Sequence, residues 1–336
     1  MHEGMNKRDV RQEGAMGATC SADRPSRPRS HTVDGRFLLE RALSHGAMSM
    51  VVAARHVQGR EPVAIKYLNP NHVRDPVVSG RFEREAKALW KCQSTHVVRL
   101  LGVGNAAPLG PYIVMERLDG KDLAQLVAEG PLGPERAMTY VMQACQALAV
   151  AHAAGIVHHD VKPENMLLSG AGEDEAVKLI DFGISEDVAH PPPPGGDWII
   201  GTPAYMAPER ITGAASTDPR SDIWSLGVSL HELATGRQPF RATCDAELCR
   251  SIASGDAPEL VRDTRLLPRV LRDIVSRCVQ PDPADRYQRV EELLYTLSEP
   301  ATAGRRQRGQ VTGTFRRSLL GRYGAKLRER SKPAPK

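Results

Sequence analysis

Four polar side chains, divided between two nearby segments, have the types and spacing needed for chemistry on a phosphate. Asp160, Lys162 and Asn165 lie within six residues of one another, and Asp181 follows residues 176–180, whose composition is typical of a strand. Phosphoryl transfer requires a carboxylate that accepts the proton of the attacking hydroxyl, oxygen ligands for Mg²⁺ and a cation close to the γ-phosphate. A polar turn between a helix and a hairpin would explain a lone His-x-Asp, but the complete set favours a phosphotransfer site.

These two segments resemble the catalytic loop and the metal-binding motif of protein kinases. The first, residues 155–165, reads Gly-Ile-Val-His-His-Asp-Val-Lys-Pro-Glu-Asn, and the second, residues 181–183, reads Asp-Phe-Gly. Residues 201–209 read Gly-Thr-Pro-Ala-Tyr-Met-Ala-Pro-Glu and resemble the substrate-docking end of a kinase activation segment. Lys162 and Thr202 are typical of Ser/Thr kinases and differ from tyrosine kinases. The motifs are most similar to those of bacterial, Hanks-type Ser/Thr kinases.

The resemblance covers residues 35–298 and implies a two-lobed α+β fold. A small antiparallel sheet with one main helix is expected to form the N-lobe, and a larger, mostly helical C-lobe is expected to follow a short hinge. The expected boundaries are 1–34 for a disordered leader, 35–116 for the N-lobe, 117–120 for the hinge, 121–298 for the C-lobe and 299–336 for a basic tail, disordered or amphipathic.

The same resemblance implies a role for each polar residue. Asp160 is expected to orient and deprotonate the acceptor hydroxyl, and Lys162 to neutralise charge on the γ-phosphate. Asn165 and Asp181 are expected to bind Mg²⁺, with Mn²⁺ as an alternative, while Lys66 holds the α- and β-phosphates of ATP. The implied activity is transfer of the γ-phosphate of Mg·ATP to Ser/Thr hydroxyls of proteins.

Lys66 closes a strand-like run and needs an acidic partner if it is buried. Within the helix expected at residues 77–93, Glu85 lies beside the apolar face, whereas Glu83 points elsewhere. A surface pair at i,i+4 spacing contributes only ~0.3–0.5 kcal/mol and would not hold a buried lysine. We therefore predict a contact between Lys66 and Glu85. The apolar face consists of Phe82, Ala86 and Leu89.

A strand–turn–strand at residues 37–54 resembles the glycine-rich lid over the ATP phosphates. It retains only the middle glycine, Gly46, and has Ser44 and Ser49 at the outer positions. We expect looser ATP binding as a result. The nucleotide pocket implied by the resemblance consists of Leu43, Gly46, Val51, Ala64, Lys66, Met115, Glu116, Leu118, Asp122, Leu167 and Asp181.

The resemblance assigns further residues to the substrate and to the architecture. Thr202 is expected to bond Asp160 and Lys162, and Glu164 to favour basic residues near the acceptor. Glu209 is expected to form a buried ion pair with Arg286. Three more residues are expected to support the loop structurally: Asp222 by capping its backbone, and His158 and Phe182 by stacking in a column with Leu89 and Leu100.

The catalytic loop departs from the family pattern at one residue. His159 replaces the arginine that pairs with an activation-loop phosphate in other kinases, and histidine lacks the bidentate fork. Between Gly183 and Glu209 the hydroxyl residues are Ser185, Thr202 and Tyr205, and none occupies the usual position of an activating phosphate. We predict activity without activation-loop phosphorylation. The alternative is a weakly active or inactive pseudokinase that works as a scaffold or nucleotide-sensing binding module.

Composition limits the remaining possibilities. No run approaches the ~18 apolar residues of a membrane span, and the cysteines (20, 92, 145, 244, 249 and 278) show no C-x-x-C spacing. We therefore expect a cytoplasmic enzyme with reduced thiols. The net charge is +5, yet residues 301–336 alone carry +10. This tail is expected to be solvated, to dock on an acidic protein or to meet an anionic surface; no specific nucleic acid is expected.

Overall fold

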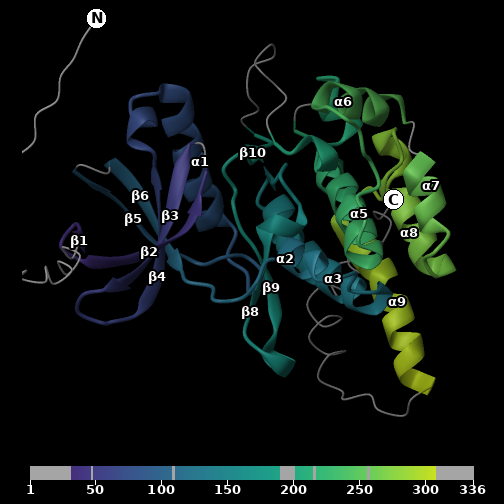
Figure 1. Cartoon of the computed structure of the whole chain (residues 1–336), viewed down its shortest axis with the longest axis horizontal. Coiled ribbons are helices and arrows are strands. Elements are labelled where there is room, and N and C mark those ends of the chain that lie inside the picture. The colour runs from purple at the N-terminus through teal and green to yellow at the C-terminus, as the bar shows by residue number, and fades with distance from the viewer. Residues whose placement is uncertain are drawn as a thin grey trace, which may run out of the picture.

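A six-stranded antiparallel sheet and a helical body form the two ends of the molecule (Figure 1). The computed structural model describes residues 32–46, 48–107, 110–189, 201–214, 217–255 and 258–307. The strand order is β1-β2-β3-β4-β6-β5. The strands are β1 (Thr32–Val33), β2 (Phe37–His45), β3 (Ser49–His56), β4 (Pro62–Leu68), β5 (Leu100–Ala106) and β6 (Gly110–Glu116).

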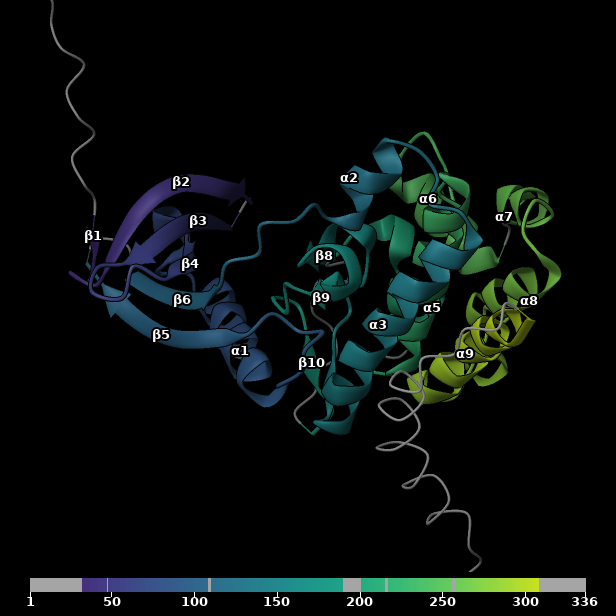
Figure 2. The same cartoon turned by 90° about the horizontal axis from the view of Figure 1, so that it is seen from below.

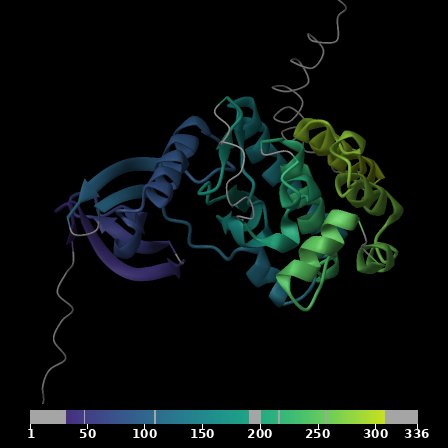
Figure 3. The same ribbon diagram turned by 90° about the horizontal axis from the view of Figure 1, so that it is seen from above.

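Helix α1 (Pro76–Lys91) lies between the sheet and the helical body (Figure 3). It begins at Asp75, whose carboxylate accepts hydrogen bonds from the N–H groups of Val77 and Val78, with a proline at the first helical position. Phe82 and Leu89 are buried on the face that packs inward, and Glu85 is buried with them. The helix thus carries an acid into the interior.

The helical body is built around the long helices α3 (Pro134–Ala153) and α5 (Arg220–Thr235). Both are buried along most of their length, because small and apolar residues cover several faces of each helix. The other helices of this body are α2 (Leu123–Ala128), α4 (Pro208–Ile211), α6 (Asp245–Ser254), α7 (Pro258–Thr264), α8 (Arg269–Cys278) and α9 (Val290–Gln307).

Four short strands frame the loop of residues 158–165 (Figure 2). Before the loop, β7 (Ile156–Val157) pairs antiparallel with β10 (Glu186–Asp187). After it, β8 (Met166–Ser169) pairs with β9 (Ala176–Leu179). Both ends of the loop are therefore fixed by backbone ladders, and residues 180–185 lie beside it.

The structure corrects three expected boundaries. Thr32–Val33 pairs with β2, so ordered structure begins inside the expected leader. The apolar run at residues 97–101 also predicts a strand. That strand starts at Leu100 instead, and Val97 forms an isolated bridge to Leu179. The last helix, expected to end by residue 298, continues to Gln307 past both Pro300 and Gly304.

Two other expectations fall on parts of the chain that are not described. The rest of the leader, residues 1–31, and the tail beyond residue 307 lie outside the described residues. In the part of the chain that the structure does describe, no helix combines the length and apolar character of a bilayer span.

Candidate active site

The loop of residues 158–165 presents one carboxylate with a fixed and a more available oxygen. Oδ2 of Asp160 accepts hydrogen bonds from Nζ of Lys162 at 2.8 Å and from Nδ2 of Asn165 at 2.9 Å. Among the residues that the structure describes, Oδ1 has one hydrogen-bond partner, the hydroxyl of Thr202 at 3.4 Å. Asp160 is thus oriented through one oxygen, which leaves the other for a proton from a hydroxyl group.

Thr202 joins the loop to the segment that follows. Its hydroxyl accepts a hydrogen bond from Nζ of Lys162 at 2.7 Å, in addition to its long contact with Asp160. The lysine therefore lies between a carboxylate and a hydroxyl. Glu164, one turn further along the loop, is exposed.

A second charged cluster connects the two lobes. Nζ of Lys66, from β4, lies 2.7 and 2.8 Å from the two carboxylate oxygens of Glu85 and 2.9 Å from Oδ1 of Asp181. Burial alone would lower the pKa of Lys66, but the carboxylates of Asp181 and Glu85 outweigh it and raise that pKa. A Cβ at Gly183 would lie 3.0 Å from Oδ1 of Asp181 and 3.4 Å from Glu85, so glycine keeps this cluster compact.

Asp181 and Asn165 provide the oxygen atoms that a magnesium ion would use. The ammonium of Lys66 holds the pKa of Asp181 down at about 2, and the side chain remains 45% exposed. Asn165 donates its amide N–H groups to Asp160, which leaves its carbonyl oxygen for a ligand. One carboxylate and one amide oxygen suit Mg²⁺, which completes its shell with water and substrate phosphates. The described residues contain no group of three or more His, Cys, Asp or Glu that would form a metal cage of their own.

The loop is supported from inside the helical body. Asp222, fully buried in α5, accepts the backbone N–H of His158 at 2.9 Å and that of His159 at 2.8 Å. The ring of His158 packs edge-on against Phe182 with centroids 4.5 Å apart. Its Nδ1 accepts from the N–H of Asp160 and its Nε2 donates to the carbonyl of Ile180, so the imidazole is neutral and structural. Burial lowers the pKa of His158 in agreement with this assignment.

A buried ion pair anchors the substrate-docking segment. Arg286 is completely buried, and its two terminal nitrogens each donate to one oxygen of Glu209 at 2.7 Å. The same guanidinium also donates to the backbone carbonyls of Gln280, Pro281 and Arg220. Because the donors find several acceptors, the desolvation cost of this pair is largely offset.

The residues expected to line a nucleotide pocket come from strands β2, β3, β4, β6 and β8, from the hinge and from the residues around it. Ala64 and Met115 lie opposite each other in the ladder of β4 and β6, and Val51 lies opposite Lys66. The lid is closed by a hydrogen bond from the N–H of Gly46 to the carbonyl of Ser49. The remaining expected residues of this pocket, apart from Lys66 and Asp181 above, are Leu43, Glu116, Leu118, Asp122 and Leu167, of which Asp122 bridges Leu167.

Glu116 and Asp122, which flank the hinge, also have structural roles. The carboxylate of Glu116 accepts from Nζ of Lys178 and from the N–H of Arg99, and its N–H donates to the carbonyl of Arg99. Asp122 caps α2 by accepting the N–H of Gln125 at 2.7 Å. Within the described chain, the backbone N–H and carbonyl of Leu118 have no hydrogen-bond partner.

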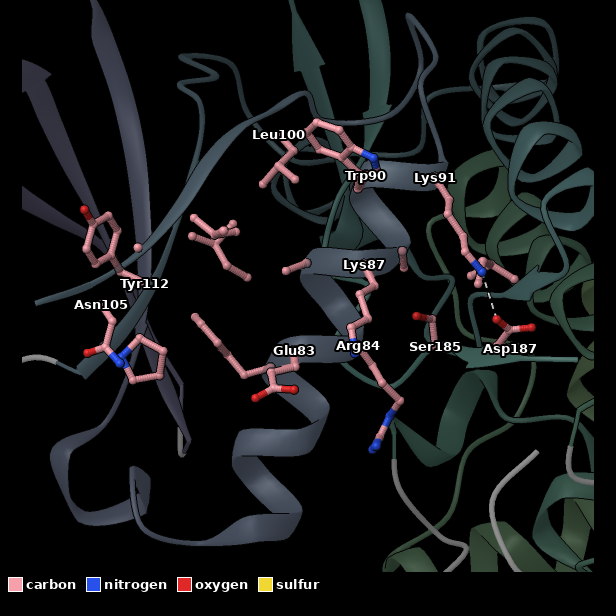
Figure 4. Close-up of a pocket in the computed structure, with 18 residues that line it drawn as sticks. Glu83, Arg84, Lys87, Trp90, Lys91, Leu100, Asn105, Tyr112, Ser185 and Asp187 are labelled. Atoms are coloured by element: carbon pink, nitrogen blue, oxygen red, sulfur yellow. Dashed lines mark hydrogen bonds and ion pairs between the residues drawn. The ribbon is translucent and has the colours of Figure 1, made fainter. Parts of the chain in front are cut away.

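A separate cavity of about 1050 Å³ is lined by α1 and by strands β5 and β6 (Figure 4). Trp90 lines it with 70% of its surface exposed. Nζ of Lys91, also in the lining, lies 2.9 Å from Oδ2 of Asp187 (Figure 4). Lys66, Asp160 and Asp181 do not line this cavity. It is therefore distinct from the site formed by Lys66, Asp160 and Asp181.

Sequence reasoning missed several polar residues around His159. Glu186 contacts the imidazole, and Arg210 donates to the His159 carbonyl. Thr217 donates its hydroxyl to Glu186 at 2.6 Å. The only sequence signal was an unexplained charge in each of two motifs, a glutamate three residues after Gly183 and an arginine directly after Glu209.

Comparisons with known proteins agree with this geometry. The family model described as the protein kinase domain matches residues 37–296. Serine/threonine-protein kinase PknB of Mycobacterium tuberculosis is 35% identical over 324 residues, covering 91% of this chain and 50% of its own length. PknL of the same species is 33% identical over 259 residues, covering 77% of this chain and 64% of PknL. PknB of Mycolicibacterium smegmatis is 36% identical over 268 residues, covering 77% and 42%.

The chain thus spans about half the length of the PknB proteins that it matches. The family match covers most of the residues that the structure describes, including both lobes and the charged residues Lys66, Asp160 and Asp181. Together with the arrangement around Asp160 and Asp181, this match shows that the chain belongs to the protein kinase family.

Proposed function

We propose that the protein is a cytoplasmic serine/threonine kinase that transfers the γ-phosphate of Mg·ATP to hydroxyl groups of other proteins. The observation that carries the proposal is the arrangement of Asp160, with Oδ2 held by Lys162 and Asn165 and Oδ1 directed at no strong partner. Such a carboxylate can accept a proton from a hydroxyl at Oδ1 while its orientation stays fixed. The names of the mycobacterial relatives support the choice of Ser/Thr acceptors.

The other residues of the cleft serve positioning and electrostatic roles in this proposal. Lys162 lies beside the proton acceptor and would offset the charge of the transferred phosphoryl group. Asn165 and Asp181 would hold Mg²⁺, or Mn²⁺, which supplies charge neutralisation at the phosphates when bound. Lys66 keeps its charge because Glu85 and Asp181 flank it, and it would hold the α- and β-phosphates.

The first test removes the proton acceptor and the phosphate-binding lysine separately. Asp160→Asn is expected to reduce ³²P transfer from Mg·ATP by about 10²–10⁴-fold while leaving ATP affinity nearly unchanged, because an amide cannot accept the proton. Lys66→Met should also abolish transfer. Lys87→Met, at an exposed position of α1, is the matched control and should behave as wild type. Undiminished transfer by the Asp160 variant would remove that residue from its role.

A second candidate function is a catalytically silent pseudokinase that acts as a scaffold or as a nucleotide-sensing module. The serines at the outer positions of the lid and the histidine at position 159 favour it. Equal ³²P incorporation by wild type and Lys66→Met, or none by either protein with both Mg²⁺ and Mn²⁺, would support this function instead.

We further propose that activity needs no phosphate on the activation segment. The three hydroxyls between Gly183 and Glu209 already have structural partners. Ser185 donates to the carbonyl of Phe182, and Tyr205 donates to Glu232 at 2.5 Å. Thr202 is engaged with Lys162 and Asp160, so each of these hydroxyls belongs to the packed structure.

The corresponding measurement compares enzyme before and after treatment with a broad-specificity phosphatase. The initial rate on a Ser/Thr peptide mixture should stay the same after the phosphatase has been removed, because no phosphate is required to hold the segment. Mass spectrometry provides the control that the treated protein carries no phosphate. A large drop in rate that recovers on preincubation with Mg·ATP would contradict the proposal.

A further inference from the structure

The starting observation is a carboxylate in an unexpected place beside the catalytic loop. Glu186 lies in β10, and its Oε2 is 3.1 Å from Nε2 of His159 and 2.6 Å from the hydroxyl of Thr217, which donates to it. The side chain of His159 is fully buried and that of Glu186 is 16% exposed. Burial would raise the pKa of Glu186, but the hydrogen bonds from His159 and Thr217 outweigh it and lower that pKa.

Each ring nitrogen of His159 has a hydrogen-bond partner. Nδ1 lies 3.2 Å from the hydroxyl oxygen of Ser221, and that hydroxyl directs its hydrogen to the carbonyl of Asp218 at 2.8 Å. The oxygen of Ser221 is then an acceptor, and the carboxylate of Glu186 is an acceptor too. Both ring nitrogens of His159 therefore lie against oxygen atoms, Nε2 against the carboxylate of Glu186 and Nδ1 against the hydroxyl of Ser221.

The guanidinium of Arg210 lies on the side of His159 that faces α4. Arg210, in α4, is only 8% exposed, and its Nη1 donates to the carbonyl oxygen of His159 at 3.4 Å. Burial lowers the pKa of Arg210, while the carboxylate of Glu186 is the foremost of the acidic groups that oppose this shift. A buried guanidinium needs such acidic neighbours, because an unpaired one is strongly unfavourable.

The backbone at His159 needs this support. Its φ angle is +67°, a left-handed conformation that is uncommon for a residue with a side chain. Asp222 holds its N–H, Arg210 holds its carbonyl and Glu186 holds its ring. The residue directly before Asp160 is therefore fixed from three separate elements: α5, α4 and β10.

We propose that Glu186 is a positioning residue whose carboxylate takes the part that a phosphate on the activation segment plays in other kinases. It connects β10 to the catalytic loop through His159 and to the residues just before α5 through Thr217. Arg210 adds a hydrogen bond to the backbone of His159. The inference rests on the proposed kinase function for its catalytic consequence, but the brace itself is a property of the fold and is measurable without catalysis.

The test creates a site for an external anion. Glu186→Ala removes the carboxylate and leaves the ring of His159 and the hydroxyl of Thr217 facing a space that sodium formate can enter, with the charge of Arg210 acting on the same position. The first readout is hydrogen–deuterium exchange of peptides spanning residues 156–165 and 208–214. Exchange there should rise in the variant and fall again with formate, but not with sodium chloride at the same ionic strength. Glu61→Ala, at an exposed turn between β3 and β4, is the matched control and should show neither effect.

The second readout is steady-state kinetics on a Ser/Thr peptide. Glu186→Ala should lower kcat by about tenfold with little change in KM for ATP, and formate should restore a substantial part of the loss. In Glu186→Ala/Arg210→Ala the rescue should disappear. Wild-type exchange and kcat in the variant, or a defect that formate does not reverse beyond chloride, would overturn the proposal. If wild type transfers no phosphate, the exchange experiment still decides between the brace and its absence.

Discussion

At the scale of single residues, an aspartate of α5 holds the backbone of the loop of residues 158–165 without belonging to the reacting groups. Asp222 accepts two backbone N–H groups of the loop and the ring Nε2–H of His152 at 2.8 Å. Burial alone would raise the pKa of Asp222, yet the hydrogen bond and charge of His152 outweigh it and hold that pKa well below its usual range. The aspartate is therefore ionised at neutral pH.

This shift makes the stability of the protein depend on pH with a defined sign. An unfolded aspartate titrates near pH ~3.9, so Asp222 stabilises the fold above that value and loses its contribution as the pH falls toward the folded pKa. Asp222→Asn should lower the unfolding free energy by about 1–3 kcal/mol at pH 7, since an amide nitrogen cannot accept the backbone donors. Urea unfolding at a series of pH values should show this difference shrinking below about pH 4.

The control for this measurement is Asp273→Asn on α8. Its side chain is 65% exposed and forms only an i,i+4 pair with Arg269, so a change within about 0.5 kcal/mol is expected. A difference between wild type and the Asp222 variant that stays constant from pH 7 to pH 2 would show that the loss arises from packing and not from the charge.

At the scale of elements, α5 is the helix against which the helical body is assembled. Gly227 lies where α5 approaches α8, and a Cβ at this position would be 2.4 Å from the Cβ of Cys278 and 3.1 Å from a methyl carbon of Val279. The two backbones can approach this closely only because the glycine carries no side chain.

Gly227→Ala is accordingly expected to force α5 and α8 apart and to destabilise the protein by about 1–3 kcal/mol. The matched control is Gly80→Ala in α1, where the nearest atom is the flexible end of Arg84 at 3.5 Å. There the same substitution should stabilise by about 0.5–1 kcal/mol through helix propensity. Thermal unfolding of both variants measures the two effects, and the same sign in both would contradict the packing argument.

The two-lobed fold and the roles expected for the charged residues came mainly from the family resemblance, and local pattern placed only part of them. The contact between Lys66 and Glu85 could be predicted because helical periodicity placed Glu85 beside an apolar face. The pair of Glu209 and Arg286 could be predicted only through the family resemblance, since 77 residues separate the partners. Local pattern could not place the carboxylate of Glu186 beside the ring of His159, because that contact depends on how β10 pairs with β7.

At the scale of the whole molecule, one continuous apolar core joins the helical body to α1. Leu89 of α1, Phe182 and Leu148 of α3 belong to the same buried cluster, whereas the outer face of the sheet has a smaller core of its own around Ile65. The helix that carries Glu85 is thus packed as part of the larger lobe while its acid contacts β4. The start of β5 was misjudged because residues 97 and 98 bond to Leu179 of the larger lobe and not to the sheet.

The brace of Glu186 and His159 is made of side chains, so it is complete from the moment the chain folds. No second enzyme has to install it, and none can strip it away. Under the proposed function, output would follow copy number and substrate supply, and a cell would tune the signal through synthesis and turnover of the polypeptide.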